Sequence, residues 1–312
     1  MRVAVIDLGT NTCNLLIAEV IKPGYKILHQ SKQLVRLGDK NIKTNQIGTE
    51  AIQRVFKALL AQKKIVKEYQ VGKVCVVATS AVREAANKID FLEKISEYTG
   101  WIVEVVSGKK EAELIFKGVL LALENMEKPS VILDIGGGSN ELILAHKAEM
   151  LWKESQPTGM ARVITQFALS NPLKPEEFII LKNFFKARHE SAFKQCRLQQ
   201  VKTLVGCSGA FDTIADIIDQ VNPGEKLRKK QEIGLDDFWK VYRLITESTR
   251  NQRLQMKGMD MVRVDLIVPA MVFIGQLIEE SEITEIIQTD FALREGVLYD
   301  LLKSPVNTEF EQ

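Results

Sequence analysis

A pattern that occurs twice constrains this chain more than any other feature of its sequence. The stretch VILDIGGGSNELIL begins at Val131, and VIDLGTNTCNLLIA begins at Val5. The two align without a gap when Asp7 is set on Asp134, an offset of 127 residues (134 − 7 = 127). In each, an acidic residue and a glycine turn separate two apolar runs, which predicts a β-hairpin. A repeat of this size indicates two related domains.

A second, weaker match supports the same duplication. VCVVATS from Val74 matches VKTLVGC from Val201 at the same offset (201 − 74 = 127), although setting Ser80 on Ser208 requires a shift of one residue. Two matched segments in the same order predict a duplicated α/β domain whose halves face each other across one cleft. Both Asp-containing hairpins are expected to border that cleft.

The glycine turn of the second hairpin indicates an anion site. Gly136, Gly137 and Gly138 carry no side chains, so their backbone N–H groups can come close to a phosphate. The flanking carboxylates of Asp134 and Glu141 cannot approach phosphate oxygens favourably without a cation between them, which favours Mg²⁺. The alternative is a hairpin that only turns, with solvated carboxylates, because glycine motifs need structural context.

The composition limits where an anion can bind. A length of 312 residues is enough for two domains with separate cores. Lys plus Arg number 42 against 40 Asp plus Glu, so the net charge of +2 provides no strong overall field to attract a polyanion. Any anion-binding site must therefore be local, and no DNA partner is expected.

Cysteine and histidine give no sign of a zinc site or a disulfide framework. The cysteines lack CxxC spacing and the histidines are isolated, so we expect the histidines to be structural or solvated. These residues are Cys13, Cys75, Cys196, Cys207, His29, His146 and His189. Free cysteines fit a reducing cytoplasm. The chain opens into a predicted strand and has no 18-residue apolar run, so neither a signal peptide nor a transmembrane helix is expected.

Apolar spacing predicts strands and helices in both halves. Strands are expected at Val3–Asp7, Cys13–Ile21, Tyr25–Leu37, Val74–Thr79, Ile102–Val106, Ala148–Ser155 and Ile283–Thr289. Helices are expected at Thr49–Tyr69, Ser80–Asn87, Ile89–Tyr98, Glu111–Leu123, Pro175–Lys194, Asp236–Ser248 and Leu266–Ile278. Thr49 is the expected N-cap of the first of these helices, and Pro269 is expected in the first turn of the last.

Pro129 and its polar neighbours favour a boundary between the halves at Asn125–Ser130. We therefore predict an N-terminal α/β domain at 1–125 and a C-terminal α/β domain at 126–312, with a closing helix from about 294 that packs back on the first domain. The PTGMAR segment, Pro157–Arg162, is expected to be a turn. The basic segment Gly224–Lys230 is expected to be a solvated face.

Six motifs in order resemble the exopolyphosphatase and guanosine pentaphosphate phosphohydrolase family. They are DLGTN at 7–11, ATSAVREAAN at 78–87, SGKKEAELI at 107–115, DIGGGSNEL at 134–142, GCSGA at 206–210 and DFALREGVL at 290–298. The resemblance covers Arg2 to about Leu302. It implies the duplicated ribonuclease H-like fold of actin, sugar kinases and heat-shock ATPases, with two domains around a central cleft. It also implies a short form without the C-terminal HD-type domain of longer members.

The resemblance implies roles for single residues. Glu111 matches the glutamate that orients the attacking water, although a glutamate in a first helical turn can merely complement the helix dipole. Arg83 matches the arginine that reaches the substrate phosphates, a role that suits guanidinium; the alternative is an exposed helix arginine. Asp134 and Glu141 are the preferred Mg²⁺ ligands, with Asp7 as a weaker third.

Three turns are expected to supply backbone amides to the substrate phosphates. Their residues are Gly9, Thr10, Asn11 and Thr12 in the first hairpin, Gly136, Gly137, Gly138 and Ser139 in the second, and Gly206, Ser208 and Gly209 in a third turn. The third turn is equally compatible with a tight strand-to-helix connection. Arg294 and Glu295 are expected to support the hinge rather than the chemistry.

The chain departs from the family pattern at four positions. Lys110 stands where an acidic residue is frequent, Asn140 and Ala210 stand where Thr is frequent, and Phe291 stands where Gly is frequent. Lys110 can alter the charge near the proposed base. Ala210 and Phe291 bring into question how the second domain recognises its ligand, because relatives in the wider superfamily bind adenosine near these turns.

The sequence therefore predicts a Mg²⁺-dependent hydrolase that removes terminal orthophosphate from inorganic polyphosphate. Cleavage of the 5′ γ-phosphate of guanosine pentaphosphate is the alternative within the family. An ATP-dependent kinase and a non-catalytic phosphate sensor of the same fold are further alternatives, although the two Asp hairpins together with Glu111 weigh against the sensor. The expected location is the cytoplasm, with no membrane partner, and a homodimer is left open.

Overall fold

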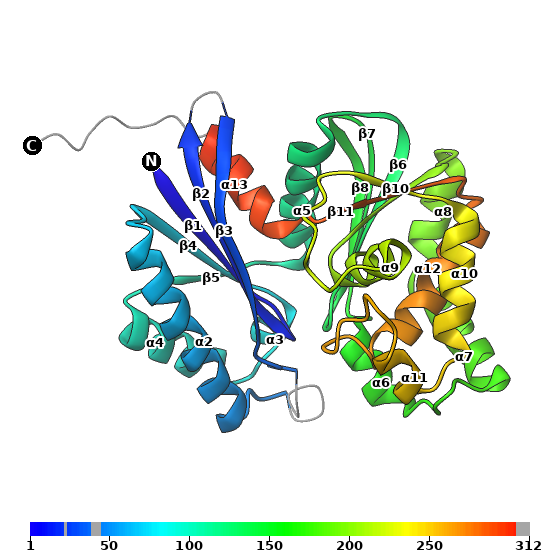
Figure 1. Ribbon diagram of the computed structural model, residues 1–312, viewed down its shortest axis with the longest axis horizontal. Coiled ribbons are helices and arrows are strands. Elements are labelled where there is room, and N and C mark those ends of the chain that lie inside the picture. The colour runs from blue at the N-terminus through cyan, green and yellow to red at the C-terminus, as the bar shows by residue number, and fades with distance from the viewer. Residues whose placement is uncertain (22–23, 39–44, 304–312) are drawn as a thin grey trace, which may run out of the picture.

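The computed structural model describes the chain except for residues 22–23, 39–44 and 304–312. It contains two mixed β-sheets, each covered by helices (Figure 1). The sheets follow one another along the chain, and each begins with an antiparallel three-stranded meander. No helix within the described ranges has the length and apolar character needed to cross a membrane.

The first sheet has the strand order β3-β2-β1-β4-β5. These strands are β1 (Arg2–Leu8), β2 (Thr12–Ile21), β3 (Gly24–Leu34), β4 (Lys73–Ala78) and β5 (Val103–Val105). Alternate residues of β1 face opposite ways, because side chains alternate along a strand. Ala4 and Ile6 pack against α2 (Thr49–Glu68) and α4 (Lys88–Thr99), while Val3 and Val5 face the other side.

The second sheet has the strand order β10-β11-β9-β6-β7-β8. These strands are β6 (Met126–Ile135), β7 (Asn140–Lys147), β8 (Glu149–Gln156), β9 (Thr203–Cys207), β10 (Gln231–Ile233) and β11 (Glu285–Thr289). One face packs on a large helical layer formed by α6 (Met160–Phe167), α7 (Pro175–Arg188), α8 (Glu190–Leu198), α9 (Gly209–Asp219), α10 (Leu235–Thr246) and α12 (Ile267–Ser281). The chain also forms the short helices α3 (Ser80–Arg83) and α11 (Arg250–Leu254).

Two helices are exchanged between the halves. Helix α5 (Gly108–Leu123) comes from the first half but covers the second sheet, and α13 (Leu293–Lys303) comes from the second half but covers the first (Figure 1). They cross closely at two glycines. A Cβ on Gly118 would lie 1.9 Å from the carbonyl oxygen of Ala292, and one on Gly296 would lie 1.8 Å from that of Leu114. Only glycine allows the backbones to approach so closely.

The hairpin repeat has a direct structural counterpart. The amide of Gly9 donates to the carbonyl of Thr12 at 2.9 Å, and 127 residues later that of Gly136 donates to the carbonyl of Ser139 at 3.0 Å. The predicted duplication of the α/β fold is therefore confirmed. The same backbone hydrogen bond, from the first glycine of the turn to the carbonyl three residues later, closes both turns.

The second alignment predicted from the sequence is wrong in register. Asp7 lies beside Val77 of β4, whereas Asp134 lies beside Cys207 of β9, so the equivalent residues are 130 apart (207 − 77 = 130) rather than 127. Ser80 is therefore not the counterpart of Ser208. Short apolar strands resemble one another at several registers, and only the pairing with the neighbouring strand selects one.

Other expected elements need correction. The segment Asn125–Ser130, predicted as the boundary between the halves, lies mostly in strand β6, which begins at Met126 and pairs irregularly with β7 as far as Ser130. Proline cannot donate a hydrogen bond to a neighbouring strand. Pro129 therefore fits at a place where the ladder is irregular. The N-cap of α2 is Gly48 rather than Thr49.

The predicted helix Pro175–Lys194 is instead two helices, α7 and α8, with His189 between them. The PTGMAR segment is not entirely a turn, because α6 begins within it at Met160. Arg228 of the supposedly solvated basic segment is buried between Asp216 and Asp219. Pro269 lies in the first turn of α12, as predicted.

Candidate active site

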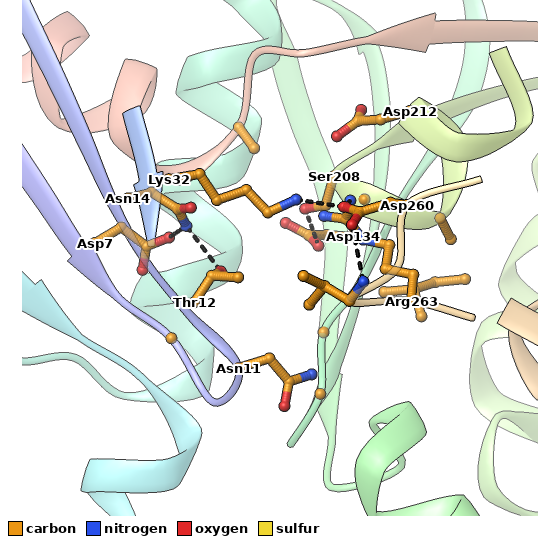
Figure 2. Close-up of a pocket in the computed structure, with 18 of the residues that line it drawn as sticks. Asp7, Asn11, Thr12, Asn14, Lys32, Asp134, Ser208, Asp212, Asp260 and Arg263 are labelled. Atoms are coloured by element: carbon orange, nitrogen blue, oxygen red, sulfur yellow. Dashed lines mark hydrogen bonds and ion pairs between the residues drawn. The ribbon is translucent and has the colours of Figure 1, made fainter. Parts of the chain in front are cut away.

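A cavity of about 680 Å³ lies between the two sheets, and both hairpin turns line it (Figure 2). Most of the site residues expected from the sequence border this cavity. They are Asp7, Gly9, Thr10, Asn11, Thr12, Glu111, Asp134, Gly136, Gly137, Gly138, Ser139, Ser208 and Gly209. Arg83, Glu141 and Gly206 are not among the residues that line it.

The carbonyl groups of the second turn bond to the start of α6. The carbonyls of Gly136 and Gly137 accept from the amides of Met160 (3.0 Å) and Ala161 (2.9 Å), and that of Gly138 accepts from Gly159 (3.3 Å). In a planar trans peptide, the C=O of one residue and the N–H of the next point in opposite directions. The amides that follow these carbonyls therefore point away from α6, and their residues line the cavity.

The first turn is supported in the same way by the segment after its own third strand. The carbonyl of Asn11 accepts from the amides of Val35 and Arg36, both at 2.9 Å, and that of Thr10 accepts from Gly38 at 3.0 Å. Two turns of like construction thus face one cavity from opposite domains. Paired amide turns of this kind suit a phosphate group.

Each turn carries one carboxylate into the cavity. Asp7 accepts a hydrogen bond from Asn14 Nδ2 at 2.9 Å, and Asp134 accepts one from Ser208 Oγ at 2.5 Å (Figure 2). Burial raises the pKa of both, and it raises that of Asp134 to about 7. Neighbouring negative charge, including that of Glu111, adds to the shift at Asp134. Such carboxylates would be stabilised in their charged form by a cation.

Glu111 reaches the cavity from the first turn of α5. The N-cap of this helix is Ser107, whose Oγ accepts from the amide of Lys110 at 3.2 Å. Oε2 of Glu111 lies 2.8 Å from Nη1 of Arg83, which also donates to the carbonyl of Val106 at 3.0 Å. Burial raises the pKa of Glu111 to about 7, although the charge of Arg83 opposes the rise. A carboxyl group with this pKa can take up a proton near neutral pH.

Comparison with known proteins identifies the family of this chain. Residues 16–305 match the sequence model of the Ppx/GppA phosphatase family. This chain belongs to that family. The match spans nearly the whole sequence, so the predicted family and the predicted enzyme class, a phosphoanhydride hydrolase, are confirmed.

Individual relatives in the Ppx/GppA phosphatase family are similar over almost their full length. "Exopolyphosphatase 2" of Mycobacterium tuberculosis is 28% identical over 289 residues, which are 89% of this chain and 90% of the relative. The crystal structure of an exopolyphosphatase from Cytophaga hutchinsonii is 34% identical, with a TM-score of 0.92 over 97% of this chain and 98% of that one. The Ppx/GppA family member of Aquifex aeolicus is 26% identical, with a TM-score of 0.82 and 97% of each chain covered. The predicted two-domain fold is confirmed.

Glu141 of this Ppx/GppA family member lies behind the turn, opposite Asp134 in the β6–β7 ladder. It is 1% exposed and accepts a hydrogen bond from Ser155 Oγ at 2.7 Å. Burial raises its pKa well above the usual range, and Glu111 and Asp134 add to this. Within the described ranges, no three acidic, histidine or cysteine side chains converge as a ready metal site.

The third turn contributes less than the sequence suggests. A Cβ on Gly206 would lie 2.0 Å from the ring of Phe211, so this glycine makes room for core packing. A Cβ on Gly209 would lie 1.7 Å from the guanidinium of Arg263, so this glycine makes room for an arginine that lines the cavity. Ser208 borders the cavity, and its hydroxyl is bonded to Asp134.

Sequence reasoning missed a group of charged residues across the cavity. Nζ of Lys32, on β3, lies 2.6 Å from Asp260 Oδ2, and Nη1 of Arg263 lies 2.7 Å from the same oxygen (Figure 2). This three-residue group, the cross-cleft bridge, joins the two domains. No motif predicts it. Asn14, by contrast, could have been found from the repeat, because it is the counterpart of Glu141 (14 + 127 = 141).

The four departures from the family pattern have different surroundings. Lys110 lies 4.0 Å from Asp300. Ala210 lines the cavity, and Phe291 is buried. Asn140 is fully buried and bonds to the segment before α6.

Arg294, expected near the hinge, also lines the cavity. Glu295, expected beside it, accepts a hydrogen bond from the amide of Ala292 at the start of α13.

Proposed function

We propose that this protein is an exopolyphosphatase, which transfers the terminal phosphoryl group of inorganic polyphosphate to water. The main observation in favour of this function is that Glu111, a buried carboxyl group with a pKa of about 7, borders a cavity between two amide turns. Relatives that are named exopolyphosphatases and that match this chain over most of its length support the assignment.

Different residues of the site bind the phosphoryl group and activate the water. The amides of the two turns bind the equatorial oxygens of the terminal phosphoryl group and stabilise its negative charge. Glu111 in its ionised form accepts a hydrogen bond from water, aims the water oxygen at phosphorus and takes its proton as the P–O bond to the shortened chain breaks. Arg83 fixes the direction of the Glu111 carboxylate through its 2.8 Å contact.

The donor chemistry fits Mg²⁺. This ion prefers oxygen ligands and is commonly held by one or two carboxylates together with substrate phosphates, so a cage of three protein ligands is not required. Asp7 and Asp134 would hold it, one from each domain, since both line the cavity and both have pKa values raised by burial. Bound there, the ion would neutralise phosphate charge. A direct contact from Glu141 would require its side chain to leave Ser155.

The alternative substrate, guanosine pentaphosphate, has one observation in its favour. The wall of the cavity in the second domain is partly apolar, formed by Ala210, Leu266, Ile267 and Ala270. Such a wall can receive the face of a base, because small-molecule sites combine apolar surface with a few polar groups. The chemistry at Glu111 would be the same for both substrates.

Phosphate release from long-chain polyphosphate, guanosine pentaphosphate and ATP, each with Mg²⁺ or EDTA, tests the proposal. We expect the highest kcat/KM for polyphosphate and loss of activity in EDTA. A preference for guanosine pentaphosphate would favour the alternative substrate. Phosphate transfer from ATP to an acceptor, without hydrolysis of polyphosphate, would overturn the proposal.

A further inference from the structure

A chain of buried hydrogen bonds lies behind the second glycine turn. Asn140 Nδ2 is 2.8 Å from the carbonyl oxygen of Thr158 and 3.1 Å from its Oγ1. Oγ1 of Thr158 is 2.8 Å from Nε2 of His189, whose Nδ1 is 3.3 Å from Oε1 of Glu154. Asn140, Thr158 and His189 are each at most 1% exposed. None of these four residues lines the cavity, so the hydrolytic site does not use them directly.

The chemistry of the four residues determines which group donates and which accepts in each of these hydrogen bonds. The carbonyl of Thr158 can only accept, so the amide nitrogen of Asn140 must face Thr158. Glu154 can accept from His189 Nδ1, which places the ring proton there and leaves Nε2 as an acceptor. Thr158 Oγ1 therefore accepts from Asn140 and donates to His189. Burial lowers the pKa of His189, which favours the neutral ring that this arrangement requires.

His189 is rigidly placed by the surrounding core. It stands at the junction of α7 and α8, where its amide donates to the carbonyl of Phe185 at 2.9 Å. Its ring stacks on Phe273 of α12, with centroids 4.5 Å apart and an interplanar angle of 28°. The hydrogen bond that His189 accepts therefore ties Thr158 to three helices of the second domain.

The two residues at the other end of the chain flank the phosphate-binding turn. Asn140 directly follows Ser139, the last residue of that turn. Thr158 directly precedes Gly159, Met160 and Ala161, whose amides bond to the carbonyls of the turn. The hydrogen bonds of Asn140 and Thr158 thus fix both sides of the contact that aims the turn's N–H groups at the cavity.

We propose that Thr158 and His189 are positioning residues for the phosphate-binding turn, a role that rests on the proposed function of that turn. They hold the segment 158–161 in register with Gly136–Gly138, so that the amide groups present a fixed site to the terminal phosphoryl group. The order Glu154, His189, Thr158 also resembles the arrangement that activates a hydroxyl nucleophile. Thr158 is buried and absent from the cavity wall, so it has no access to substrate.

Two substitutions at His189 separate its two hydrogen bonds. In His189→Gln the terminal amide reaches the place of Nε2 and keeps the contact with Thr158. In His189→Asn it reaches only the place of Nδ1 and loses that contact. Both remove the ring that stacks on Phe273, so they share most of the packing cost. Thr158→Val removes the hydroxyl. The control is Thr246→Val, which loses a partly buried 2.8 Å hydrogen bond to the carbonyl of Tyr242 on α10.

We expect KM for polyphosphate to rise about tenfold in His189→Asn and Thr158→Val, and less than about threefold in His189→Gln and Thr246→Val. A purely structural defect would lower the amount of active enzyme, and hence apparent kcat, at unchanged KM. Equal KM values in the Gln and Asn variants, or a Thr158→Val variant that behaves as Thr246→Val does, would overturn the proposal.

Hydrogen exchange of the Met160 and Ala161 amides provides a test that needs no substrate. We expect exchange about tenfold faster or more in Thr158→Val and His189→Asn, with no change in Thr246→Val, because the amides that bond to Gly136 and Gly137 would open more often. If the wild-type protein releases no phosphate from polyphosphate, the proposed function fails while this readout still tests the positioning role. Unchanged exchange would contradict that role.

Discussion

Nη1 of Arg83 lies 2.8 Å from Oε2 of Glu111, so an arginine and the proposed general base form an ion pair at the edge of the active cavity. The two residues come from α3, which packs in the core of the first sheet, and from α5, which covers the second sheet. The positive charge opposes the effect of burial on Glu111 and leaves its pKa at about 7. The pair therefore determines the pH range in which the base can act.

Activity should rise with pH through this range. Glu111 must be ionised to accept a proton, and its pKa is raised to about 7, so kcat/KM should be low at pH 5 and approach a plateau above about pH 8. The measurement is kcat/KM for polyphosphate from pH 5 to 9 at constant ionic strength. A profile that is flat between pH 5 and 8 would show that no group with this pKa limits the reaction.

Replacing Arg83 should move that profile. In Arg83→Gln the charge that lowers the pKa of Glu111 is lost, so the ascending limb should shift upward by on the order of one pH unit. Lys110→Gln is the control, because Lys110 precedes Glu111 on the same helix but lies near Asp300. A limb that stays in place in Arg83→Gln would contradict the ion-pair account. The reading of Arg83 as a direct phosphate ligand predicts a higher KM instead.

Asp7 and Asp134 should control the metal requirement. Asp7→Asn and Asp134→Asn each remove one proposed ligand, so the Mg²⁺ concentration for half-maximal activity should rise at least roughly tenfold. Asp237→Asn, which changes an exposed aspartate paired with Lys240, is the control. Magnesium curves that superimpose on the wild-type curve would remove both residues from the metal site.

The cross-cleft bridge should affect substrate affinity. Asp260 offsets part of the positive charge of Lys32 and Arg263 at the cavity, so Asp260→Asn should lower KM for long polyphosphate roughly threefold, and Lys32→Met should raise it by a similar factor. Both effects should weaken at high salt, because ions screen these partly exposed charges. A KM that responds to neither substitution would indicate that the polyanion does not pass this bridge.

The parts of the site that could be predicted are those carried by short sequence segments. The two Asp hairpins and the position of Glu111 in a first helical turn follow from local patterns, and the structure places them on one cavity. The continuous apolar run Val3–Ile6 is typical of a central strand, and β1 is covered on both faces. These features need no information about distant residues.

The parts that could not be predicted depend on contacts between distant segments. Lys32 and Asp260 are 228 positions apart, and nothing in the sequence near either residue indicates the other. Glu141 is expected as a metal ligand from its pattern, and its hydrogen bond with Ser155 could not be read from that pattern. Arg228 belongs to a basic segment that looks solvated, and only the fold supplies the aspartates that bury it. Register and burial are decided by tertiary packing, which a local pattern does not contain.

The most direct test of the central claim is turnover of Glu111→Gln with long polyphosphate, measured beside binding of the same substrate. The neutral amide cannot take the proton of water, so we predict that kcat falls roughly 10²-fold or more while the dissociation constant changes little. Glu113→Gln, a change on the same helix at a side chain paired with Lys153, should keep near-normal turnover. Wild-type turnover in Glu111→Gln would contradict the assignment of Glu111 as the base.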